Sequence, residues 1–481
     1  MKRKFVLNLF LLLLLNILVK PFWVFGIDRN VQIAVGQAEY GVYFALFNLS
    51  LVLNILLDIG ITNFNNRNIA QHNFLAAKHL EKMVILKVIL AVFYTIVTFS
   101  VGLIVGYRGY QLFLLGILAL NQFLNSFILY LRSNVSALQM FKTDGFLSIT
   151  DRFLMIIICS YLLWGGFSSN GFKIEWFILA QSVAYLLTIL ITFTILIRKI
   201  KITSVKIDYL FSILILKKSL PYALLILLMG IYNRLDSIFI ERLLENGDKH
   251  AGIYAQGYRV LDALNMFAYL FAGLLLPMFA YMIKNRQDVR QIIRLAANFL
   301  LVPALIIALG CFTFKSDIIG ALYHHSDEYS ALTFGILILG FVPISVTYIF
   351  GTLLTANGSL KELNLMAIFA VIINIVLNLV LIPRYQAVGA AISSLTTQTF
   401  AAVVQFLIAK RIFSINIKKS VYLSVLLFIA SIIIFSYLSS FFTLPWFAEL
   451  LLLSVLSLIM AQILKIFDVK AIYQLIRLRE D

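Results

Sequence analysis

Long apolar runs without charge are the feature that most constrains how this chain can fold. The run Val421–Phe442 contains no charged residue and matches the roughly 20 residues needed to cross a bilayer. Similar runs recur along the whole chain. Backbone groups in hydrocarbon must bond to each other, so these runs must be helices. A membrane β-barrel needs alternating segments of about ten residues, which the sequence lacks. The pattern predicts an all-α integral membrane protein.

Charge supports this assignment and indicates an orientation. The chain is 62% hydrophobic and 13% charged, with a net charge of +17; soluble proteins are about half apolar and about a quarter charged. With a cytoplasmic N-terminus, 29 of the 39 Lys and Arg residues fall on the cytoplasmic side and seven on the other. This bias follows the positive-inside rule, so we expect no nucleic-acid binding. It predicts a multi-pass protein of the bacterial inner membrane with both termini cytoplasmic.

We expect about fourteen membrane-spanning helices. The basic residues Met1–Lys4 precede an apolar stretch without a cleavage motif, which is therefore read as the first span and not as a signal peptide. The predicted spans are 5–27, 40–61, 83–107, 111–131, 146–165, 176–197, 219–241, 252–283, 294–314, 331–355, 363–382, 387–409, 421–442 and 446–466.

The two halves of the chain resemble each other. Gly41 and Tyr43 open a helix after a short outside loop, and Gly252 and Tyr254 do the same in the second half. An even number of predicted spans separates them, which favours a parallel repeat about an axis normal to the membrane. The predicted domains are an N-terminal lobe of six helices at 1–200, a basic cytoplasmic linker at 201–218, a C-terminal lobe of six helices at 219–409, and two further helices with a cytoplasmic tail at 410–481.

Motifs of enzymes are scarce in this sequence. It has no nucleotide-binding loop, no dinucleotide fingerprint and no metal-spaced set of His or Cys residues. Cys159 and Cys311 both fall in predicted spans and are interpreted as buried structural thiols. We therefore expect no enzymatic activity, no cofactor and no metal, and the chain by itself is not expected to be an ATP-driven pump.

Charges inside predicted spans are the candidate functional residues, because a charge at the bilayer centre costs several kcal/mol and faces a cavity or a partner. Counted from the predicted helix ends, the three cations each lie about seven residues, or roughly 10 Å, below the outer surface. Three cations at one depth suit a diphosphate, and the acids are candidates for ion coupling. The cations are Lys20, Arg234 and Arg259, and the acids are Asp58, Asp236 and Asp262.

Internal pairing of these charges is the competing interpretation. Arg259 and Asp262 are three residues apart on one helical face, so they can neutralise each other. Arg234 and Asp236 point about 200° apart on their helix and cannot pair with each other. Asp58 lies near the inner end of its span, where a structural contact or a gating role is an alternative to ion binding.

Six parts of the sequence carry short motifs that occur together in one known family. They are Glu39–Tyr43, Asp58–Gly60 with Arg67, Gly351–Gly358, Asn374–Asn378, Ile382–Tyr385 and Val388–Ala391. Together they resemble the motifs of the Wzx-type oligosaccharide flippases of the MOP superfamily (multidrug, oligosaccharidyl-lipid and polysaccharide exporters). Gln386 departs from the family pattern, which has glycine at this turn in many members.

The resemblance implies a fold and a function. The fold is two six-helix lobes around a V-shaped central cavity, as in MATE transporters, with two additional C-terminal helices. The function is transport of undecaprenyl-diphosphate-linked oligosaccharide from cytoplasm to periplasm for polysaccharide or lipopolysaccharide synthesis, by alternating access driven by an ion gradient or the membrane potential. Membrane lipids and polysaccharide polymerase machinery are the other expected partners. The alternatives are a MATE-like multidrug exporter and a membrane polysaccharide polymerase or glycosyltransferase.

Overall fold

Helices form all the regular secondary structure of the described residues, and these include no strand. The computed structural model describes residues 16, 18–59, 76–138, 140–166, 171–198, 209–323, 326–415, 419–439 and 444–466. The basic N-terminus, the motif residues Gly60 and Arg67, the first half of the predicted linker and the C-terminal tail from 467 lie outside these residues.

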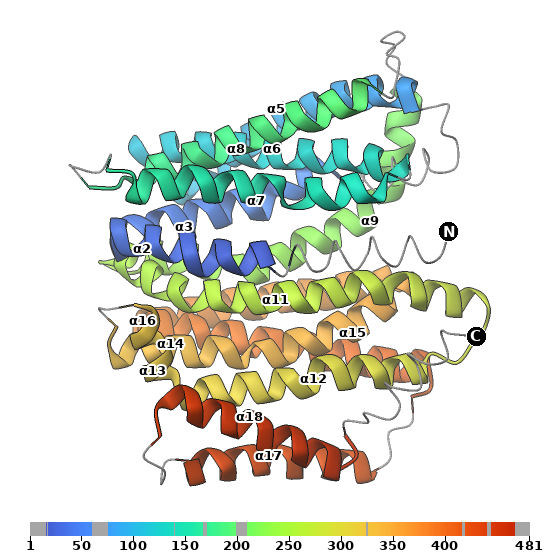
Figure 1. Ribbon diagram of the computed structural model, residues 1–481. Coiled ribbons are helices and arrows are strands. Elements are labelled where there is room, and N and C mark those ends of the chain that lie inside the picture. Colours follow the sequence, from blue (N-terminus) through green and yellow to red (C-terminus); the bar gives the residue numbers. More distant parts are fainter. Residues whose placement is uncertain are drawn as a thin grey trace. The chain divides into compact units, whose positions relative to one another are not determined.

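The helices follow one another along the chain with short connections (Figure 1). Their bounds are η1 Trp23–Asp28, α2 Arg29–Val35, α3 Gln37–Val52, η2 Leu53–Leu57, α5 Ala76–Val105, α6 Tyr110–Ala137, α7 Phe141–Trp164, α8 Ile174–Ile197, α9 Tyr209–Arg234, α10 Asp236–Leu243, α11 Gly247–Lys284, α12 Arg290–Thr313, α13 Lys315–Leu322, α14 Glu328–Leu339, α15 Phe341–Asn357, α16 Leu360–Ile412, α17 Lys419–Ser439 and α18 Trp446–Ile463. Here η1 is a π-helix and η2 a 3₁₀-helix.

The predicted class of all-α membrane protein is confirmed. Among the described residues, 11 helical segments are long and apolar enough to cross a membrane, or up to 12 if the bent pair α9–α10 is one span. Two of these segments, Leu18–Leu57 and Leu360–Ile412, have 40 and 53 residues, which is about twice the length of one span. The predicted count of fourteen is reached if the bent pair is one span and each of the two long segments is divided into two at its internal break. That count stays a prediction.

Each of the two long segments contains one residue with non-helical backbone angles. Gly36 separates α2 from α3 with a φ of 82° and a ψ of 169°, a conformation that glycine adopts without strain. Gln386 interrupts α16 with a φ of 53° and a ψ of −131°. A third break, at Leu235, bends α9 against α10 by 44°. The first helical segment continues through Val35, beyond its predicted end at residue 27.

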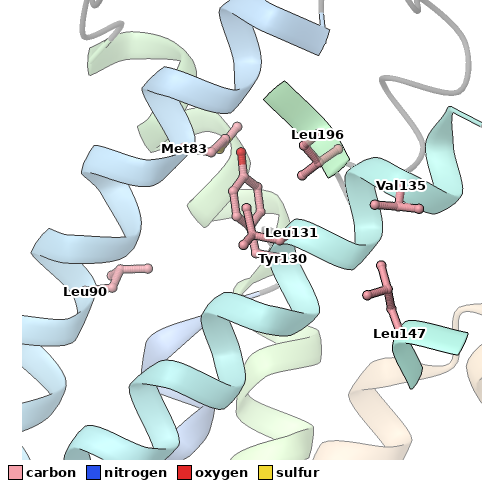
Figure 2. Close-up of a cluster of buried hydrophobic side chains, with 7 residues drawn as sticks. All are labelled: Met83, Leu90, Tyr130, Leu131, Val135, Leu147 and Leu196. Atoms are coloured by element: carbon pink, nitrogen blue, oxygen red, sulfur yellow. The ribbon is translucent and has the colours of Figure 1, made fainter. Parts of the chain in front are cut away.

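The chain divides into two compact units, Met1–Ala255 and Gln256–Asp481. In the first unit, α6 packs against α5, α7 and α8, and α3 packs against α6 and α10 (Figure 1). Figure 2 shows part of its core, where the ring of Tyr130 lies among apolar side chains of four helices. The other residues of this cluster are Met83, Leu90, Leu131, Val135, Leu147 and Leu196.

The second unit is built around α12, α14, α15 and α16: α14 and α15 each pack against both α12 and α16. The C-terminal helices α17 and α18 pack against each other and against α12. Phe428 and Ile432 of α17 are buried on Val302 and Ile306 of α12. The two C-terminal helices are therefore an integral part of this unit's core.

Candidate substrate and ion sites

The structure describes all six predicted site residues and divides them between the two units. Lys20, Asp58, Arg234 and Asp236 belong to the first unit, and Arg259 and Asp262 belong to the second. The helix ends do not support one common depth for the three cations. Lys20 lies fifteen residues before the end of α2, Arg234 nine before the end of α10, and Arg259 twelve after the start of α11. The helices extend further than their hydropathy indicated, and the common depth of the three cations stays a prediction.

Arg259 and Asp262 form an ion pair on α11, with 3.9 Å between Nη1 and Oδ2. Both side chains are partly exposed, at 14% and 16%. The structure therefore contains the internal pair that the three-residue spacing allowed.

Asp58 has a lysine partner on another helix. The Lys87 ammonium of α5 lies 2.5 Å from the Asp58 carboxylate. It also donates hydrogen bonds to the Leu57 carbonyl and the Ser126 hydroxyl, at 3.0 and 2.9 Å. Lys87 is 1% exposed, and a buried charge is stable only when it is paired and hydrogen-bonded. The contact holds the C-terminal end of η2 against α5 and α6.

Arg234 and Asp236 lie at the bend between α9 and α10, where polar side chains connect α3 to these helices. The Asn48 amide donates to the Ser237 hydroxyl at 2.9 Å, and Arg234 Nη1 donates to Asn48 Oδ1 at 3.4 Å. Asp236 begins α10, is buried, and accepts a hydrogen bond from the Tyr254 hydroxyl at 2.9 Å. The start of a helix also favours a negative charge. The bend is thus held by side chains of α3 and α11.

Lys20 lies elsewhere in the first unit, in the helical turn before η1. Arg152 of α7 stacks over the neighbouring ring of Trp23, with 5.5 Å from the guanidinium carbon to the ring centroid. Arg152 and the adjacent Asp151 lie within the predicted span 146–165. In the structure Arg152 is eleven residues from the start of α7 and twelve from its end. The structure therefore places an arginine at the middle of α7, within electrostatic range of Lys20.

Asp28 is a buried acid that the sequence analysis assigned to an outside loop. It ends η1, is 2% exposed, and accepts a hydrogen bond from the Tyr40 hydroxyl at 2.8 Å. Apolar residues recur as far as Val35, but Arg29, Asn30 and Gln32 interrupt them. The predicted span therefore ends at residue 27 and leaves Asp28 in a loop.

A polar cluster joins the C-terminal end of α10 to the turn between α5 and α6. The Arg242 guanidinium stacks 3.8 Å over the Tyr107 ring, and its Nε lies 2.8 Å from the Glu241 carboxylate. Gln111 of α6 donates to Glu241 and accepts from Arg242. Burial raises the pKa of the Tyr107 hydroxyl, and the nearby Glu241 carboxylate raises it further.

The two repeated glycines lie where α3 and α11 cross: Gly41 of α3 lies against α11, and Gly252 of α11 lies against α3. A β-carbon on Gly41 would lie 1.9 Å from the Asp248 carbonyl oxygen, and one on Gly252 would lie 2.0 Å from the Gln37 carbonyl oxygen. Small residues allow helices to approach closely in membranes. The motif that suggested an internal repeat therefore also marks the crossing of α3 with the start of α11.

Comparison with known proteins identifies the family. The family model described as polysaccharide biosynthesis protein matches residues 6–283, more than half of the chain. The chain belongs to this family. The comparison with curated proteins found no match for this chain.

Solved structures show the fold of this family member. The lipid II flippase MurJ in an inward closed conformation has a TM-score of 0.70 and 15% identity, covering 94% of this chain and 98% of MurJ. A multidrug resistance MATE transporter of the MOP superfamily, inward-facing, has a TM-score of 0.62 and 16% identity, covering 81% and 94%. A MOP superfamily transporter from Pyrococcus furiosus, described by a binding pocket of reverse polarity, has a TM-score of 0.58 and 16% identity, covering 85% and 94%. The family model thus confirms the predicted family, and these solved structures confirm the predicted MATE-like fold.

Proposed function

We propose that this protein flips undecaprenyl-diphosphate-linked oligosaccharide units from the cytoplasmic to the periplasmic leaflet of the bacterial inner membrane. The transported units would serve polysaccharide or lipopolysaccharide synthesis. The match to the polysaccharide biosynthesis family carries this proposal. The likeness to a lipid II flippase supports it, because that neighbour is a flippase with the same fold. The protein would work by alternating access. An ion gradient or the membrane potential would supply the energy for transport, and no chemical step is needed.

The candidate residues suit a diphosphate and an ion. Lys20, Arg234 and Arg259 would bind the diphosphate, because a bare phosphate charge cannot cross hydrocarbon without cations that replace its hydration. Asp236 and Asp262 would weaken the site enough for release and, together with Asp58, would couple transport to an ion.

The proposed layout follows the sequence prediction. Lobes at 1–200 and 219–409 would rock against each other around the substrate, with the linker at 201–218 and both termini in the cytoplasm. Polysaccharide polymerase machinery would receive the flipped unit on the periplasmic side. Matching helix starts at Gly41 and Gly252 support two equivalent lobes.

Gene deletion tests the function. We expect cells without the protein to accumulate lipid-linked oligosaccharide on the cytoplasmic side, where a membrane-impermeant glycosidase does not reach it in intact spheroplasts. Expression of the wild-type protein should restore its exposure to the enzyme, and an unrelated flippase should not. Normal surface glycan, with no accumulated lipid-linked unit, would refute the proposal.

A multidrug exporter is the second candidate, supported by the likeness to MATE transporters. The deletion strain distinguishes the two functions. Export of cationic drugs predicts a lower inhibitory concentration for several drugs together with normal surface glycan. The proposed flippase predicts the reverse. Polymerase or glycosyltransferase activity, the third candidate, predicts accumulation of single units that are already exposed on the periplasmic side.

A further inference from the structure

Lys20 belongs to a helix face that lies against α7. Asn16, Lys20 and Trp23 are spaced four and three residues apart, which places them on one side of a helix. The first and last of them contact α7: the Asn16 amide donates to the Ser148 hydroxyl at 3.0 Å, and Arg152 stacks over Trp23. Lys20 lies between these two contacts. It therefore faces the stretch of α7 that Ser148 and Arg152 define.

That face of α7 carries charge from its start to its middle. Asp144, Ser148 and Arg152 follow at intervals of four residues, a rise of roughly 12 Å along the helix. Asp144 pairs with Arg132 of α6, with 2.9 Å between carboxylate oxygen and Nε. Arg152 pairs with the adjacent Asp151 at 3.6 Å. The charged face thus runs from the helix end predicted to be cytoplasmic to mid-membrane.

The cluster has an excess of positive charge and access to solvent. Its three cations, Lys20, Arg132 and Arg152, face two acids, which leaves one net positive charge; Arg132 and Asp151 lie within electrostatic range of Lys20. The two ion pairs are 15% to 29% exposed. Partly exposed charges in a span are far more costly in lipid than in water. The arrangement is therefore stable only where the exposed sides of these charges border water.

We propose that Lys20, Arg132 and Arg152 form an anion site within the first unit, at which the diphosphate of a lipid-linked substrate first binds from the cytoplasmic side. This inference rests on the proposed function and adds two arginines that the family resemblance and the buried-charge pattern did not assign. Arginine suits the role because its planar guanidinium binds phosphate oxygens in pairs. Asp144 and Asp151 orient the arginines and keep the affinity low enough for the ligand to move on.

Binding to the purified full-length protein tests this site. Native mass spectrometry in detergent measures the Kd for undecaprenyl diphosphate, for undecaprenol, which lacks the diphosphate, and for phosphatidylglycerol, a bilayer source of phosphate. We expect Arg132→Gln and Arg152→Gln each to raise the Kd for undecaprenyl diphosphate by about tenfold or more. Undecaprenol should bind weakly to every variant.

Two further variants separate binding from folding. Asp151→Asn removes the competing acid and should lower the Kd several-fold, whereas a purely structural ion pair predicts no gain. Arg290→Gln is the matched control, because Arg290 also pairs with a nearby acid at 3.6 Å but is 59% exposed and lies outside the cluster. Its Kd should equal that of the wild type. If Arg152→Gln fails to fold, Arg132→Gln and Asp151→Asn decide the question.

Different results would overturn the proposed anion site and the proposed flippase function. Wild-type affinity in both arginine variants, with normal flipping in cells, would overturn the site and leave the proposed function standing. Tighter binding of phosphatidylglycerol than of undecaprenyl diphosphate would overturn the assignment to the transported lipid. Absence of any undecaprenyl diphosphate binding in the wild type would overturn both proposals.

Discussion

Partners decide what each intramembrane charge of this protein can do. Lys87 and Asp58 form a buried pair, Asp236 accepts from Tyr254, and Arg259 lies beside Asp262. Removing one member of a buried pair leaves the other charge uncompensated, which costs about 3–5 kcal/mol. A loss of activity after a single substitution therefore does not by itself show that a residue binds substrate.

A double substitution separates binding from pairing at Arg259. We expect Arg259→Gln to reduce surface glycan about tenfold, because a charge-assisted contact to the diphosphate is lost. Adding Asp262→Asn removes the charge left behind but not the need for a cation. The double variant should therefore fold at wild-type level and remain defective, as measured by immunoblot and glycan staining. Recovery of glycan in the double variant would remove Arg259 from the site.

Gln386 has a backbone conformation that favours glycine. Its φ of 53° with a ψ of −131° costs a side-chain-bearing residue about 1–3 kcal/mol, and its side chain is exposed. We expect Gln386→Gly to stabilise the protein by about 1 kcal/mol after the entropy cost of glycine, measured by unfolding in mixed detergent micelles. Gln386→Ala keeps the strain and should leave stability unchanged. A glycine variant less stable than the alanine variant would contradict this account.

Helices α3 and α11 cross so closely at Gly41 and Gly252 that there is no room for a side chain at either position. We expect Gly41→Ala and Gly252→Ala each to reduce the amount of folded protein and of surface glycan, because a β-carbon would overlap a backbone carbonyl. Immunoblots of membranes and glycan staining measure both effects. Gly273→Ala is the matched control, since this glycine of α11 has no atom within 4 Å of the added carbon. There alanine should be neutral or slightly stabilising.

The effect of the two glycine variants on transport depends on whether α3 and α11 separate when the lobes move. If α3 and α11 separate during transport, the glycine variants should lose transport more than protein level. If they stay together, both should fall in parallel. A polar cluster lies in the same unit, between the C-terminal end of α10 and the turn that joins α5 to α6. Its residues are Tyr107, Gln111, Glu241 and Arg242.

Orientation in the membrane is a property of the whole molecule, and the charge distribution predicts it. We expect cysteines introduced as Asp248→Cys and Ser326→Cys to react with a membrane-impermeant thiol reagent in intact spheroplasts, because both positions are predicted to be periplasmic. Cys159 and Cys311 are first replaced by serine. A cysteine in the predicted cytoplasmic tail should react only after lysis. Labelling of the two periplasmic positions only after lysis would refute the layout.

Several properties of this protein follow from the sequence alone. The backbone in hydrocarbon must satisfy its own hydrogen bonds, so the apolar runs determine an all-helical membrane protein. The motif residues around Asn374 and Gly389 indicated the family, and the position of Gln386 at a turn was predicted from them. The presence of charge in the first, seventh and eighth spans was likewise predictable, because each charge interrupts an apolar run.

Tertiary structure alone decided which charges meet partners on other helices. Lys87 with Asp58, Tyr254 with Asp236, and Arg152 with Trp23 join residues 18 to 129 positions apart. Their contacts depend on the rotation and depth of each helix. In a membrane, both are set by close packing of small residues and by interhelical polar contacts, which leave no periodic signal in the sequence. Hydropathy locates a span to within a few residues, whereas an ion pair needs its two charges within about 4 Å.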